Sequence, residues 1–173
     1  MNFPRILKKR KGYIDRIKPF MQKSVVKVLT GQRRVGKSFL LYQLIEEILA
    51  KEPDANIIYV NLEDFTFSSL QTAEDLHSYI ISHSKEKVKN YIFIDEIQDI
   101  PGFEKVIRSL LLNEDNDIYI TGSNAKMLSG ELATYLSGRY IEFKIYSLSY
   151  SEFLEFHGLT ESETSYELYS RYG

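Results

Sequence analysis

The chain has 173 residues, which suits one domain with a full hydrophobic core. Its 22 Lys and Arg residues against 24 Asp and Glu residues give a formal net charge of -2, so no global charge drives it toward nucleic acid or an anionic membrane. The absence of cysteine excludes disulfides and thiolate metal sites. No apolar run has the length of a signal peptide or a membrane span, so we expect a soluble, cytoplasmic protein without a membrane partner.

Basic residues gather near the N-terminus, in the run KKRK at residues 8–11. Such a run can bind nucleic acid or an anionic surface. Because it contains no aromatic residue and the chain is almost neutral, a solvated helix face is the simpler interpretation, although Tyr13 follows closely and keeps nucleic acid open as a partner. We expect residues 1–23 to form a basic, helical segment that packs on the core.

After this segment, short apolar runs alternate with helical patterns, which is typical of a parallel sheet with crossover helices. Most runs are apolar on both faces, which predicts strands covered from both sides. The run that begins at Tyr140 instead alternates, with Ile141 and Phe143 on one face and Glu142 on the other, which indicates an edge strand. The four buried runs are residues 25–30, 57–62, 91–97 and 117–123.

Apolar stripes at helical spacing follow two of these runs. Leu40, Leu44 and Ile48 form the first stripe. A second amphipathic pattern covers residues 103–111, and a third begins near Ser149. We therefore expect an α/β fold with helices on both faces of the sheet.

Residues 31–38, GQRRVGKS, match the phosphate-binding loop pattern G-x-x-x-x-G-K-S/T. Glycines permit a tight backbone wrap whose N–H groups converge on phosphate oxygens at the positive end of a helix. The pattern follows an apolar strand and precedes an apolar-striped helix, which disfavours a coincidental glycine turn. Lys37 then reaches the β- and γ-phosphates, and the Ser38 hydroxyl becomes a Mg²⁺ ligand. The nucleotide-binding residues that we predict here are Gly31, Gln32, Arg33, Arg34, Val35, Gly36, Lys37, Ser38 and Phe39.

The two inner arginines of the loop are the least defined part of it. Arg33 and Arg34 are most simply solvated loop residues. The alternative is that either one contacts phosphate or a partner subunit.

Asp95 and Glu96 end another apolar run, IFIDEIQ. Adjacent carboxylates at the mouth of a buried strand are costly unless a cation or a proton transfer uses them. For this pair alone, the simpler interpretation would be an acidic, solvent-exposed connection from the strand to the next loop. Next to a phosphate-binding loop we expect Asp95 to hold Mg²⁺ through its water shell and Glu96 to polarise the attacking water.

Polar residues also follow the run IYI, as TGSN. Ligands of open parallel sheets bind beyond the carboxyl ends of the strands, so Ser123 and Asn124 can reach the γ-phosphate or the attacking water, although Asn is also common in turns. Arg139 opens the fifth strand, either as a structural charge near a helix end or as a group that stabilises transition-state charge.

Together, residues 28–45, 91–111 and 118–156 resemble the prokaryotic predicted ATPases of the AAA+-like P-loop class, in which an ATPase domain precedes a C-terminal domain of unknown function. With strands numbered in chain order, the resemblance implies a five-stranded parallel sheet of order 5-1-4-3-2. It also implies that Ser123 and Asn124 form the first sensor and that Arg139 is an arginine finger, which if used in trans requires a homo-oligomer. Residues 24–158 would be the ATPase core, and residues 159–173 would begin a further region.

The leading hypothesis is an ATPase that binds Mg²⁺ and ATP through Lys37, Ser38 and Asp95, and hydrolyses ATP with Glu96, Asn124 and Arg139. A second hypothesis is a nucleotide-gated module that holds ATP or ADP, turns over negligibly and acts on a protein partner or on its own C-terminal domain. A GTPase is disfavoured because no N-K-x-D element is present, and direct action on nucleic acid depends only on residues 8–11.

Overall fold

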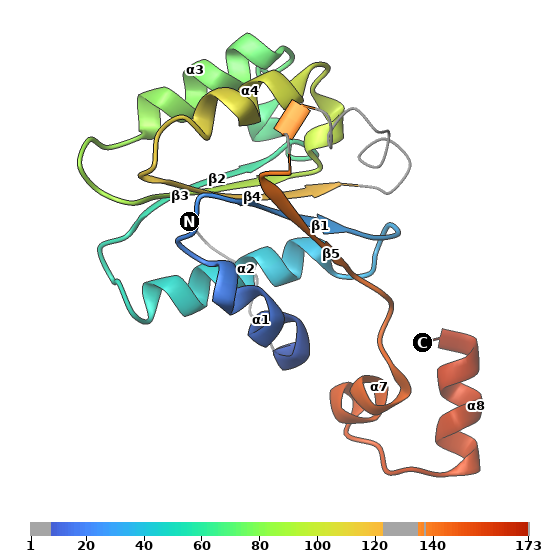
Figure 1. The fold of residues 1–173 in the computed structure, drawn as a ribbon. Coiled ribbons are helices and arrows are strands. Elements are labelled where there is room, and N and C mark those ends of the chain that lie inside the picture. Colours follow the sequence, from blue (N-terminus) through green and yellow to red (C-terminus); the bar gives the residue numbers. More distant parts are fainter. Residues whose placement is uncertain (1–7, 123–134, 137, 173) are drawn as a thin grey trace.

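The computed structural model describes residues 8–122, 135, 136 and 138–172, in which a five-stranded parallel sheet lies between two layers of helices (Figure 1). The strand order is β2-β3-β4-β1-β5, which confirms the order implied by the family resemblance. β5 lies at one edge, as its alternating pattern predicted. The strands are β1 (Val26–Thr30), β2 (Asn56–Asn61), β3 (Asn90–Asp95), β4 (Asn116–Gly122) and β5 (Tyr140–Lys144).

The strand ends differ from the prediction in one place that matters for the site. The third apolar run continues to residue 97, but β3 ends at Asp95. Glu96 has a left-handed backbone (φ 56°, ψ 47°), which breaks the strand and starts the 3-10 helix η3 (Ile97–Asp99). Glu96 therefore lies outside the sheet, directly after Asp95.

Two different sets of side chains cover the two faces of the sheet. On β3, Ile92 and Ile94 join an aliphatic core with the helices of one layer, whereas Tyr91 and Phe93 join the core of the other layer. Phe93 stacks on Tyr119 of β4, with ring centroids 4.5 Å apart. Because successive residues of a strand point to opposite faces, this division follows directly from the sequence order. The aliphatic layer contains α3 (Ala73–His83) and α4 (Phe103–Leu110), and the other layer contains α1 (Lys11–Ile17) and α2 (Lys37–Leu49).

The remaining short helices lie at the ends of strands and helices. They are η1 (Lys18–Phe20), which follows α1, and η2 (Phe65–Phe67), which follows β2.

The chain after β5 forms a helix pair that stands away from the sheet (Figure 1). It consists of α7 (Tyr150–His157) and α8 (Glu163–Tyr172). Ser149 begins α7 as predicted, in a reciprocal capping box with Glu152. Phe153 of α7 packs edge-on against Tyr169 of α8, with ring centroids 5.5 Å apart. Among the described residues, no helix combines the length and apolar character needed to span a bilayer.

Candidate functional site

The loop between β1 and α2 lies at the carboxyl edge of the sheet, between Thr30 and the first helical residue, Lys37. Arg34 (φ 68°) and Gly36 (φ 91°) both have left-handed backbones, whereas Val35 between them does not. Left- and right-handed residues in alternation turn successive backbone N–H groups toward one concavity, which attracts anions. The loop therefore has backbone dihedral angles that suit anion binding.

The start of the loop packs against the chain that follows β5. Ile145 N donates a hydrogen bond to Thr30 O at 2.7 Å. A Cβ atom at Gly31 would overlap the carbonyl oxygen of Ile145. Glycine is needed at this position because two backbones approach each other closely.

Lys37 is buried at the first position of α2, and its Nζ atom faces the loop from within. It donates hydrogen bonds to Gly31 O at 3.2 Å and Gln32 O at 3.1 Å. It also lies 3.4 Å from Glu96 Oε1. The structure thus brings together two of the predicted catalytic residues, one cation and one carboxylate, at the end of the sheet.

Asp95 is 1% exposed and is held by three polar side chains. Its Oδ1 atom accepts a hydrogen bond from Thr121 Oγ1, and its Oδ2 atom accepts one from Tyr59 OH at 3.3 Å. Burial raises the pKa of Asp95, and hydrogen bonds from Ser38 and Thr121 partly oppose that rise. The two predicted Mg²⁺ ligands, Ser38 and Asp95, are therefore hydrogen-bonded neighbours.

Glu96 is 6% exposed, and both of its carboxylate oxygens have partners. Oε1 faces Lys37, and Oε2 accepts a hydrogen bond from Gln98 Nε2 at 2.7 Å. Its backbone N–H donates to Thr121 Oγ1 at 3.0 Å. Thr121 thus bonds both acidic residues, one through its hydroxyl hydrogen and the other through a lone pair.

Sequence reasoning missed Thr121 and Tyr59. Tyr59 lies in the apolar middle of β2 and Thr121 follows the apolar middle of β4, and each directs a hydroxyl group to Asp95. These hydroxyl groups were the available signal, but only the sheet order shows that β2 and β4 flank β3.

A cavity of about 540 Å³ opens above these groups. Its volume falls in the range of small-molecule sites. Arg33 and Glu63 pair at 3.3 Å on its exposed rim. Its lining residues are Arg33, Arg34, Gly36, Lys37, Ser38, Phe39, Glu63 and Glu96.

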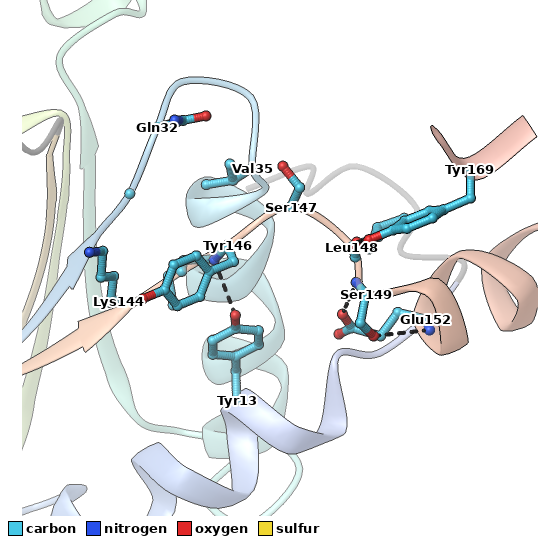
Figure 2. A pocket seen from close by; sticks show the side chains of 12 residues that line it. Tyr13, Gln32, Val35, Lys144, Tyr146, Ser147, Leu148, Ser149, Glu152 and Tyr169 are labelled. Carbon is cyan, nitrogen blue, oxygen red and sulfur yellow. Dashed lines mark hydrogen bonds between the residues drawn. The ribbon is translucent and has the colours of Figure 1, made fainter. Parts of the chain in front are cut away.

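A second cavity, of about 660 Å³, also touches the loop and was not predicted (Figure 2). Gln32 and Val35 line it from the loop, and Tyr169 lines it from α8. In Figure 2 the rings of Tyr13 and Tyr146 lie close together below the loop, and Tyr146 N donates to Tyr13 OH at 3.1 Å.

Comparison with known proteins agrees with this geometry. Residues 23–154 match the AAA domain family. The chain belongs to the AAA domain family. It is 42% identical over 171 residues to an uncharacterized protein of Haemophilus influenzae, and 38% identical over 132 residues to one of Methanocaldococcus jannaschii.

These matches cover 94% and 76% of the chain but only 42% and 28% of the relatives, so the chain spans less than half the length of the curated relatives that it matches. Among solved structures, the Saccharomyces cerevisiae Hsp104–ADP complex has a similar fold, with a TM-score of 0.67 and 13% identity over 88% of this chain and 24% of that one. The AAA domain is thus a nucleotide-binding, ATPase-like domain with the P-loop α/β fold.

Arg139 of this AAA domain is not brought to its own phosphate-binding loop. It is exposed and immediately precedes Tyr140, which pairs with Val26 at the start of β1, whereas the loop follows Thr30 at the end of β1. Four residue steps along a parallel strand cover about 13 Å. Arg139 therefore lies where the strands begin, whereas Lys37 lies at their carboxyl ends. The predicted sensor residues Ser123 and Asn124 lie outside the described residues.

The basic run at residues 8–11 is partly bound to the rest of the chain. Lys9 pairs with Glu47 at 2.9 Å, and the Arg10 side chain is only 5% exposed. The prediction of a solvated helix face is therefore wrong at Arg10, because a carboxylate and backbone carbonyls of the same chain accept hydrogen bonds from its guanidinium. The described part of this run presents less free positive charge to nucleic acid than its sequence indicated.

Proposed function

We propose that this AAA domain binds ATP with Mg²⁺ and hydrolyses it to ADP and phosphate. One observation carries the proposal: Lys37, Ser38 and Glu96 line a single cavity at the carboxyl edge of the sheet, with Asp95 bonded to Ser38 beneath it. These groups are the cation, the hydroxyl and the two carboxylates that phosphoryl transfer to water requires.

The loop would bind the phosphates. The concave backbone at residues 33–38 supplies N–H donors at the positive end of α2. The Lys37 ammonium is already directed into the loop by two backbone carbonyls, so little side-chain ordering remains when phosphate binds.

Ser38 and Asp95 fit the preference of Mg²⁺ for hydroxyl and carboxylate oxygens. Held by these two residues, the ion would supply positive charge against the negative charge that develops on the phosphate oxygens. Thr121 and Tyr59 would keep Asp95 in place through their hydrogen bonds to its two oxygens.

Glu96 would act as the general base. In the described structure its Oε1 atom neutralises Lys37. A γ-phosphate beside Lys37 competes for that cation, which leaves Oε1 to accept the proton of the attacking water. Gln98 holds the other oxygen and so fixes the direction of the carboxylate.

The 660 Å³ cavity would receive the nucleoside end of ATP. It adjoins the same loop at Gln32 and Val35 and offers the rings of Tyr13 and Tyr146 to a planar base. Ser123 and Asn124 would contact the γ-phosphate or the attacking water. Arg139 would serve the site of a neighbouring subunit, so full activity would require a homo-oligomer.

A nucleotide-gated module with negligible turnover is a second candidate. It is favoured by the position of Arg139, which leaves the site of a single chain without that cation. A module would act on a protein partner or on the further domain that its longer relatives have room for. Negligible turnover by both this chain and a longer version that includes such a domain supports the module, whereas turnover by the longer version supports the ATPase.

Lys37→Ala tests the proposal most directly. We expect steady-state phosphate release to fall by about 10²-fold or more, because a buried cation at the transferring phosphate is lost. Lys51→Ala, an equal charge change at an exposed residue just beyond α2, should behave as the wild type. Turnover that is equal in Lys37→Ala and the wild type would contradict the proposed site.

A further inference from the structure

The guanidinium of Arg10 has every one of its N–H donors occupied. Nε and Nη2 form a bidentate pair with the Glu152 carboxylate, both at 2.9 Å. Nη1 donates to Val35 O at 3.1 Å and to Tyr146 O at 2.9 Å, and Nη2 also donates to Ser147 O at 3.3 Å. The ATP-binding and hydrolysis roles proposed above assign nothing to Arg10 itself, although its acceptors line the second cavity.

The acceptors come from three separate parts of the chain. Val35 lies inside the phosphate-binding loop, between its two left-handed residues. Tyr146 and Ser147 belong to the connection between β5 and α7, and Glu152 lies in the first turn of α7. One side chain therefore joins the loop to the start of the α7–α8 pair.

Both ends of this link are themselves fixed. The backbone N–H of Arg10 donates to Gln43 Oε1 of α2 at 3.0 Å, so the arginine is anchored on the helix that follows the loop. Glu152 Oε2 also accepts the backbone N–H of Ser149, the N-cap of α7, at 2.9 Å. Charge-assisted hydrogen bonds therefore connect Val35 to the N-cap of α7 through Arg10 and Glu152.

The second cavity lies between the parts that Arg10 joins. Gln32 and Val35 line it on the loop side, and Glu152 and Tyr169 line it on the side of α7 and α8. A molecule that is bound there and on the loop would contact both sides of the link.

We propose that Arg10 is a positioning residue that couples the phosphate-binding loop to the α7–α8 pair, so that nucleotide on the loop stabilises α7 in its docked position. By thermodynamic reciprocity, breaking the Arg10–Glu152 pair weakens nucleotide binding. The inference rests on the proposed function, since the ligand of the loop is taken to be ATP. Beyond that function, the inference is that α7 responds to the binding of nucleotide at the loop.

The test compares Glu152→Gln with Glu155→Gln by hydrogen exchange and by calorimetric titration with Mg²⁺ and ATP. Glutamine at 152 keeps the size of the side chain but removes the charge of the pair. Glu155 is exposed on the same helix and provides the same charge change as a control. In the wild type and Glu155→Gln, ATP should slow amide exchange in the loop and at residues 150–157.

In Glu152→Gln we expect the ATP dissociation constant to rise by about fivefold or more. Exchange at residues 150–157 should no longer respond to ATP, although the loop is still protected. Arg10→Lys, which keeps a charge but lacks the planar fork, should resemble Glu152→Gln. A merely structural role would lower the melting temperature but leave the ATP response of α7 intact, and that result would overturn the inference.

A measurement without nucleotide separates this inference from the proposed function. In the ligand-free protein, exchange at residues 33–38 should be faster in Glu152→Gln than in Glu155→Gln. Unchanged loop exchange overturns the link even if ATP binds. Faster loop exchange in a protein that does not bind ATP supports the link and refutes the proposed function alone.

Discussion

Replacing Glu96 by glutamine separates the chemical role of this residue from its role in binding. Glutamine has the same size and can still receive the hydrogen bond from Gln98 at its amide oxygen. It cannot accept a proton from water at neutral pH, and it carries no charge beside Lys37. General-base catalysis typically contributes about 10²- to 10⁴-fold, so we expect the turnover rate to fall by a factor in that range.

ATP binding should become tighter in the same variant. The Glu96 carboxylate lies 3.4 Å from Lys37 Nζ and competes with phosphate for that cation. Two unit charges at this separation attract each other by about 5 kcal/mol at an effective dielectric constant of about 20. Recovering about 1.4 kcal/mol of this attraction would lower the dissociation constant tenfold.

Single-turnover phosphate release and calorimetric ATP titration measure the two effects separately. Glu63→Gln is the matched control, because it removes one carboxylate from the rim of the same cavity. Its partner Arg33 is exposed, and exposed ion pairs contribute little, so we expect its turnover to change less than about threefold. If Glu96→Gln hydrolyses ATP within threefold of the wild-type rate while Lys37→Ala does not, Glu96 is not the general base.

Three further predictions concern the loop, the buried charges and pH. Arg34→Gly should raise the free energy of unfolding, as measured in urea, by about 1 kcal/mol, because glycine adopts a left-handed backbone without the steric cost. Weaker ATP binding by this variant would show that the arginine side chain contacts phosphate. Lys27→Met should lower the free energy of unfolding by about 3–5 kcal/mol, since Lys27 and Asp117 are a fully buried ion pair and the carboxylate would lose its cation. The hydrogen bond from Arg10 lowers the pKa of Glu152 below its ordinary 4.5, so the stabilisation that Glu152 provides is complete above that value and is lost as pH falls through the lowered pKa. Melting temperatures of the wild type and Glu152→Gln should accordingly differ at pH 7 and converge in acid.

Much of the fold could be predicted from the sequence because each strand carries its own local signal. The runs of β1 to β4 are apolar on both faces, and β5 alternates, so burial and edge position followed from composition. The full strand order did not follow from such patterns, since several orders with β5 at an edge would bury the same apolar residues. It came from the family resemblance and is confirmed by the pairing of β4 between β1 and β3.

The candidate site was predictable where its residues are contiguous. The loop at residues 31–38 and the pair Asp95–Glu96 are short motifs at strand ends, and parallel strands bring their carboxyl ends to one edge. Arg10 was not predictable, because its acceptors lie 25 to 142 residues away and a buried arginine looks in sequence like any other member of a basic run. Only the fold distinguishes it from its exposed neighbour Lys9.

The position of Arg139 follows from strand direction and constrains how this AAA domain can work. In a parallel sheet all strands begin at the same end. A residue that precedes β5 must therefore lie at the opposite end of the strands from a loop that follows β1. An arginine there can reach a phosphate only if a second copy of the chain places its loop against that end. The Arg10 link lies at the loop edge and connects the site to α7 within one chain. If both residues act as proposed, Arg10 connects the site to α7 at the carboxyl ends of the strands. Arg139 completes the site of a second chain from the amino ends of the strands. A defect in the first would then alter nucleotide affinity at any protein concentration, whereas a defect in the second would alter turnover only where the chains associate.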